Sequence, residues 1–219
     1  MTLGRRLVAE AVGTALLVAA VIGSGIMAAR LAGGDGATAL LANTLATGGA
    51  LIALILTFGP ISGAHFNPIV SATLAARREL PAGDAVQYAV VQIAGGFGGA
   101  VLANLMFDLD AVTWSTTPRH GFPLLLSEAV ATFGLVGVVI AVSRTRPSVA
   151  PFAVAAYIVA AYWFTASTSF ATPAVTIARA ASDTFAGIRP GDVPGFIGAQ
   201  LVGGAAAAAL FGWLFARDA

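Results

Sequence analysis

The sequence predicts an all-α membrane protein, with six transmembrane helices and two re-entrant half-helices arranged as an inverted repeat. Of its 219 residues, 58% are apolar and 10% are charged, whereas a soluble domain carries about 25% charged residues. Six apolar runs are long enough to cross about 30 Å of hydrocarbon. Two shorter segments, each with a proline where a helix would begin, lie at corresponding places in the two halves of the chain.

The apolar runs set the order of the predicted spans. We expect helices of about 20 residues at residues 7–29, 38–58, 84–107, 122–143, 149–167 and 194–216. The connections at 30–37, 109–121 and 144–148 hold most of the remaining charge, as loops should. Arg5 and Arg6 precede the first run as they would in a signal peptide. That run is longer than the apolar part of a signal, so we expect it to be a span.

The first half-helix is predicted directly after the second span. Asn67 has the chemistry of an N-cap and Pro68 that of a first helical residue. The apolar sequence that follows, up to Ala76, carries this helix for about ten residues, or roughly 15 Å, which is half of a bilayer. A weaker copy of the pattern lies at residues 169–178, where Thr172 and Pro173 take the same places.

The two halves of the chain repeat one another. The matching segments are Glu10–Thr14 with Glu128–Thr132, Asn67–Val70 with Thr172–Val175, and Gly83, Asp84 and Gln92 with Gly191, Asp192 and Gln200. We therefore predict one transmembrane channel domain over residues 1–219, with repeats at about 1–110 and 118–219. Each repeat holds three spans, an odd number, so the second repeat enters from the opposite face. The half-helices then meet at their N-termini near the midplane.

Arginine counts predict how the chain is oriented. If both termini are cytoplasmic, the inner face holds Arg5, Arg6, Arg77, Arg78, Arg144, Arg146 and Arg217. The outer face then holds Arg30, Arg119, Arg179 and Arg189. Because cytoplasmic loops carry an excess of basic residues, we expect a multi-pass protein of the cell (plasma or inner) membrane with both termini in the cytoplasm.

The segments before the half-helices predict a pore. Non-helical backbone is tolerated at membrane depth where it is buried in protein or lines a water-filled path. We expect permeating molecules to donate hydrogen bonds to its carbonyl groups, which are those of Gly63, Ala64, His65, Thr168 and Phe170. Each helix N-terminus carries about half a positive charge. Two of them at the midplane would repel protons and metal cations and let a neutral polar solute pass.

Together these motifs resemble the aquaporin and aquaglyceroporin family, the major intrinsic proteins, over essentially the whole chain. The resemblance rests on the paired half-helix motifs, the Glu-x-x-Gly-Thr start of the repeat, and the segment Gly63–Pro68. It implies a passive channel that assembles in the lipid bilayer as a homotetramer, with one pore in each subunit.

The chain departs from the family at both half-helix motifs. The family has Asn-Pro-Ala twice, whereas this chain has Asn67-Pro68-Ile69 and Thr172-Pro173-Ala174. The resemblance places Asn67 and Thr172 at the midplane of the pore. We expect the Thr172 hydroxyl to turn toward the backbone of its helix, so that the midplane binds solute asymmetrically.

A second departure concerns the outer constriction. The family usually has arginine directly after the second motif, and this chain has Val175. The family's spacing places the other constriction residues at Thr47, Ala160 and Ser169, a small and uncharged set that predicts a wide opening. Arg179 lies one turn after Val175, and we expect it to face solvent or headgroups rather than to replace the missing charge. Tyr162 and Trp163 are both candidates to reach the pore, and spacing does not choose between them.

Glu10 and Glu128 are the acidic residues deep inside the predicted spans. An intramembrane carboxylate can mark an ion site or a proton relay. The resemblance implies that each instead accepts hydrogen bonds from backbone N–H groups of the opposing re-entrant loop, and their symmetric placement favours such a support.

Several other kinds of site are not expected. His65 could bind a metal ion, but the second histidine, His120, lies in a loop predicted on the opposite side. The chain has no cysteine, which removes thiolate chemistry. We therefore expect no metal, no cofactor and no catalytic residue, and the net charge of +1 gives no reason to expect a nucleic-acid partner.

The predicted function is a passive channel for small neutral solutes through a wide, uncharged constriction. Glycerol-like polyols, metalloid hydroxides such as arsenous acid, and water fit this opening. One alternative is a secondary transporter, which is also built from inverted repeats but would need an ion site beyond Glu10 and Glu128. Another is a water-selective channel. Short loops argue against an adhesive protein, and no nucleophile–base pair suggests an enzyme.

Overall fold

The computed structural model describes residues 1–215 and contains only helices and connecting loops in that range. Six helices are long and apolar enough to cross a membrane, the fifth together with the 3₁₀ turn Pro147–Val149 that precedes it. They are α1 (Leu3–Leu31), α2 (Gly36–Ser62), α4 (Ala82–Met106), α5 (Phe122–Thr145), α6 (Ala150–Phe164) and α8 (Val193–Leu214). Residue 216 of the predicted last span, and Arg217, lie outside the described residues. The predicted fold class is confirmed.

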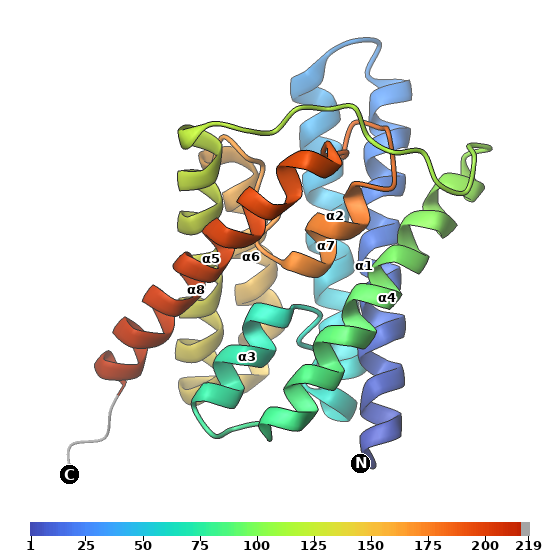
Figure 1. The fold of residues 1–219 in the computed structure, drawn as a ribbon. Helices are drawn as coiled ribbons and strands as arrows, with labels where there is room; N and C mark the ends of the chain where they lie inside the picture. Colours follow the sequence, from blue (N-terminus) through green and yellow to red (C-terminus); the bar gives the residue numbers. More distant parts are fainter. Residues whose placement is uncertain (216–219) are drawn as a thin grey trace.

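Two short helices occupy the centre of the molecule, α3 (Pro68–Ala76) and α7 (Pro173–Arg179). Figure 1 shows α3 in one half of the molecule's depth and α7 in the other, with the loops that precede them meeting between. The order of three long helices and one short helix is the same in both halves of the chain. The start of α1, the end of α3 and the end of α8 lie at the same end of the molecule (Figure 1). The arrangement is an inverted repeat, as predicted.

Local chemistry starts the first half-helix where the sequence places it. The Asn67 Oδ1 atom accepts a hydrogen bond of 2.9 Å from the backbone N–H of Ile69, and Pro68 is the first helical residue. Asn67 itself is extended, as an N-cap should be. The helix runs for 9 residues, close to the predicted length.

Glycines let the long helices cross at backbone contact. A Cβ atom at Gly95 would lie 2.2 Å from the carbonyl oxygen of Ala11, and one at Gly99 would lie 2.2 Å from that of Ala15. In the second repeat, a Cβ atom at Gly203 would lie 2.1 Å from the Ala129 carbonyl oxygen. Helix α4 therefore crosses α1, and α8 crosses α5, closer than any side chain would permit.

The fifth span ends earlier than predicted. Helix α6 stops at Phe164, and Thr165 is extended, so the chain turns inward before residue 167. On the same face of the molecule, the connection between α4 and α5 crosses over the end of α7. Its backbone N–H groups at Thr113 and Ser115 donate to the carbonyl oxygens of Ala181 and Ala180. These bonds hold the second half-helix and the loop after it in place.

Candidate functional site

A cavity of about 320 Å³ runs through the centre, between the two repeats. At one end it is lined by Leu74, Glu79, Ser143 and Ala150. At its middle and other end it is lined by Asn67, Thr172, Thr47, Tyr162, Val175 and Arg179. Both half-helices and both re-entrant loops therefore contribute to one passage.

The loops that enter this passage have an unusual backbone. Ala64 and Phe66 in the first loop, and Thr168, Ser169 and Ala171 in the second, have φ angles between 47° and 60°. Residues other than glycine rarely adopt this left-handed conformation, and each costs on the order of 1 kcal/mol or more. Such loops persist only where surrounding groups hold them.

Glu10 holds the first loop. Its Oε1 atom accepts hydrogen bonds from the backbone N–H of His65 (2.9 Å) and from Ser62 Oγ (2.6 Å). Its Oε2 atom accepts from the backbone N–H of Phe66 and from Gln92 Nε2, both at 2.8 Å. A carboxylate has about four acceptor positions, and this fully buried one uses all of them on the protein. No acceptor position remains for a transported ion.

Glu128 does the same for the second loop. It accepts from the backbone N–H groups of Phe170 (2.9 Å) and Ala171 (3.0 Å), and from Gln200 Nε2 (2.7 Å). The prediction that each carboxylate binds the opposing loop was wrong, since each binds the loop of its own repeat. The reason is that the first helix of each repeat packs beside its own third span, so the carboxylate faces its own half-helix.

The two midplane residues behave differently. Asn67 Nδ2 donates to the carbonyl oxygen of Ala171 at 2.8 Å, which links the two loops. The prediction that Thr172 bonds its own helix was wrong, because its hydroxyl forms no cap and has no partner in the described chain. The Ser169 hydroxyl is also buried without a partner, and both residues line the cavity. A buried hydroxyl is normally hydrogen-bonded, so these two hydroxyls are exceptions beside the passage.

The outer constriction differs from the predicted one at α6. Thr47, Ser169 and Val175 line the cavity, but Ala160 lies exposed on the outside of the helix. Tyr162 takes the predicted place, 3% exposed, with its hydroxyl 3.2 Å from Thr47 Oγ1. Residues two apart on a helix differ by about 200° in direction. Tyr162 therefore lies on the side of α6 that faces the cavity, and Ala160 lies on the side that faces away from it.

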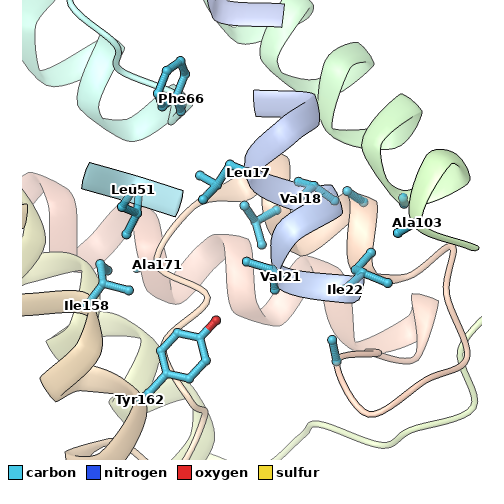
Figure 2. Close-up of a cluster of buried hydrophobic side chains, with 14 of the residues drawn as sticks. Leu17, Val18, Val21, Ile22, Leu51, Phe66, Ala103, Ile158, Tyr162 and Ala171 are labelled. Atoms are coloured by element: carbon cyan, nitrogen blue, oxygen red, sulfur yellow. The ribbon is translucent and has the colours of Figure 1, made fainter. Parts of the chain in front are cut away.

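Figure 2 shows Tyr162 and Ile158 projecting from α6 toward the side chains of Leu17, Val21 and Leu51. Trp163, the other candidate, is half exposed and faces away from the core. Leu17, Val21, Leu51, Ile158 and Tyr162 form one wall of the cavity. The sequence did not predict this apolar wall. A signal was present, because Ala150, Val154, Ile158 and Tyr162 recur every fourth residue along a single helical face. In an apolar helix that spacing does not by itself say which face meets the pore.

The prediction that Arg179 faces solvent or headgroups was also wrong. Arg179 is 2% exposed and lines the cavity. Its guanidinium lies on the ring of Phe170, with Cζ 3.4 Å from the ring centroid. The end of α7 is covered by the connection before α5, so this side chain turns inward rather than toward headgroups.

The other predicted pore residues fall into two groups. Gly63, Ala64, His65 and Phe170 line the cavity, whereas Thr168 does not. The His65 ring is held by its Nδ1 atom, 3.0 Å from Ser71 Oγ. Across residues 1–215, no cluster of three or more histidine or acidic residues is placed to hold a metal ion.

Six spans, two half-helices meeting at their N-termini, and one passage beside them define a transmembrane channel. The chain matches the major intrinsic protein family over residues 1–172. It belongs to that family, whose members are passive channels and not enzymes. It is accordingly a multi-pass membrane protein that passes small solutes.

Individual relatives agree with this assignment. The chain is 54% identical to aquaglyceroporin AqpS of Rhizobium meliloti (strain 1021), over 97% of this chain and 91% of that protein. It is 33% identical to aquaporin NIP2-3 of Zea mays, over 85% of this chain and 63% of the relative. Among solved structures it resembles the aquaglyceroporin from Plasmodium falciparum, with a TM-score of 0.69 at 20% identity, covering 98% of this chain and 96% of that one.

Proposed function

We propose that this channel conducts small neutral solutes with several hydroxyl groups, together with water, down their concentration gradients. These solutes are glycerol-like polyols and undissociated metalloid hydroxides such as arsenous acid. The observation that carries the proposal is the two-sided lining of the cavity. Ser169 and Thr172, whose buried hydroxyls have no partner within residues 1–215, line a passage whose other residues include Leu17, Val21 and Val175.

A polyol suits such a lining because its carbon chain and its hydroxyls lie on different sides. The apolar wall takes the carbon atoms, and the free hydroxyls and the loop carbonyls of Gly63, Ala64 and His65 take the hydroxyl groups. A metalloid trihydroxide is compact, uncharged and also carries hydroxyls. The likeness to a protein named as an aquaglyceroporin, at 54% identity, supports this class of solute. The half-helix N-termini at the midplane disfavour cations.

We also propose that both termini are cytoplasmic in the cell membrane and that the assembly is a homotetramer. Arg179 is buried and Arg119 is partly buried, with its guanidinium bonded to loop carbonyl groups, so both should be left out of the comparison of loop charge. The outer face then keeps Arg30 and Arg189, against six described arginines on the inner face, which strengthens the charge argument. The tetramer rests on family resemblance.

Purified protein in liposomes tests the solute class. Stopped-flow light scattering should show glycerol and arsenous acid fluxes above those of empty vesicles, rising linearly with the gradient. A flux that saturates and responds to an ion gradient would favour a secondary transporter. Water flux without either solute would indicate a water-selective channel and would overturn the proposal.

A further inference from the structure

One arginine is buried in the wall of the cavity. Arg179 is the last residue of α7, one helical turn beyond Val175, and both side chains line the same cavity. Arginine is almost never fully buried unless it is paired. A charged side chain at membrane depth usually marks a solute pathway.

Two contacts fix the Arg179 side chain. Its Nε atom donates to the carbonyl oxygen of Ala186. Its guanidinium stacks on Phe170, whose ring packs edge-on against Phe196 at a centroid distance of 5.1 Å. Stacking uses the face of a guanidinium and leaves its in-plane donors available. Nη1 and Nη2 make no hydrogen bond to residues 1–215, so donors remain for a solute in the cavity.

The positive charge is incompletely neutralised. Within the described chain Arg179 forms no ion pair, and neither does Arg119, whose guanidinium lies 5.0 Å from the centroid of the same Phe170 ring. Arg119 is held by the carbonyl oxygens of Gly187 and Ser167. Glu128 lies beneath this loop with its oxygens bound to the backbone and to Gln200. Two cations against one carboxylate leave the outer half of the passage positive.

We propose that Arg179 is a specificity-determining residue, supplying from the next helical turn the fixed positive charge that is absent at Val175. It excludes protons and metal cations by repulsion in a water-poor passage. Its free Nη donors orient the oxygen atoms of entering solutes. The proposal rests on the proposed function, because it assigns a selectivity role within the same pore.

The test measures proton entry into liposomes for variants that change the charge at position 179 or at an arginine outside the pore. Arg179→Gln removes the charge, Arg179→Lys keeps it, and Arg30→Gln removes an exposed arginine at the same end of the molecule, outside the pore. Proton entry is followed with a pH-sensitive dye in the vesicle lumen under an imposed membrane potential, and glycerol flux is measured on the same preparations. Proton entry through Arg179→Gln should exceed that of the wild type about tenfold, as expected for loss of one nearby charge. Arg179→Lys and Arg30→Gln should match the wild type.

A double variant tests whether the charge, and not the arginine at position 179 itself, blocks proton entry. Val175→Arg combined with Arg179→Gln returns the charge to the preceding turn and should restore low proton entry while glycerol still passes. Wild-type proton entry in a folded, glycerol-conducting Arg179→Gln protein would overturn the inference. If Arg179→Gln fails to fold, the other two variants still test the inference. High proton entry through Arg179→Lys, or through a glycerol-conducting double variant, would overturn it as well. Absence of glycerol flux in the wild type would instead contradict the proposed function.

Discussion

At the scale of single residues, Tyr162 is the aromatic side chain of α6 that lines the cavity. Its ring is buried against the apolar wall of the cavity and its hydroxyl is held by Thr47. The neighbouring Trp163 is also a large aromatic residue, but it is half exposed and points about 100° away around α6. The pair therefore offers a matched comparison of pore-facing and outward-facing aromatic side chains.

Tyr162→Ala should widen the opening and admit larger polyols. We expect the ratio of erythritol to glycerol permeability in liposomes to rise about fivefold, which corresponds to a barrier lower by about 1 kcal/mol. Trp163→Ala should leave this ratio unchanged. An unchanged ratio in Tyr162→Ala, or equal changes in both variants, would show that Tyr162 does not limit the passage.

Thr172→Val tests the free hydroxyl at the midplane. This hydroxyl has no partner within residues 1–215, so thermal stability in detergent should change by less than about 0.5 kcal/mol. Glycerol flux should fall about fivefold, because a net hydrogen bond to solute is worth about 1 kcal/mol.

Thr176→Val provides the contrast to Thr172→Val. Its hydroxyl donates to the Thr172 carbonyl and accepts from Gln200 Nε2. Removing it strands a buried donor and should cost about 1–3 kcal/mol of stability. If Thr172→Val lost stability and kept its glycerol flux, the Thr172 hydroxyl would stabilise the fold and would not bind solute.

At the scale of helices and loops, the sequence predicts what local chemistry decides. Asn67 and Pro68 start a half-helix through contacts within a few residues, so its position follows from the sequence alone. Which face of α6 meets the pore is decided by how α6 packs against α2 and α5, and the sequence of a helix that is apolar on all sides does not indicate that face. The family spacing therefore predicts Ala160, whereas Tyr162 lines the cavity. Glu10 and Glu128 were recognised as supports, but their partner loops depend on how helices pack.

The crossing of α4 and α1 gives a prediction at this scale. Gly99 lies against the Ala15 carbonyl, whereas a Cβ atom at Gly98 would meet nothing within 4 Å. Gly99→Ala should therefore force the helices apart and cost about 1–3 kcal/mol. Gly98→Ala, on the same helix, should be neutral or slightly stabilising because alanine favours helix. Thermal unfolding followed by circular dichroism compares the two, and equal melting temperatures would contradict the close crossing.

At the scale of the whole molecule, the pore depends on pairing two half-repeats of opposite orientation. The repeat itself was visible in the sequence, because its matching residues occur in the same order. The charge of the outer mouth was not visible. Arg179 is only one arginine among four assigned to the outer side, and burial by the connection before α5 distinguishes it from Arg30. A count of charges in the sequence does not distinguish a buried arginine from an exposed one, whereas the structure does.

The orientation of the chain can be tested by labelling single introduced cysteines, because the sequence has no cysteine of its own that would also react. Ala37 and Ser148 are exposed, in the first turn of α2 and in the 3₁₀ turn before α6, at opposite ends of the molecule. We expect a membrane-impermeant maleimide to label Ala37→Cys in intact cells and to label Ser148→Cys only after the membrane is opened. The reason is that the basic inner face, which includes Arg144 and Arg146 beside Ser148, stays in the cytoplasm. The reverse pattern would invert the orientation. Labelling of both sites from outside would contradict the odd number of crossings between them.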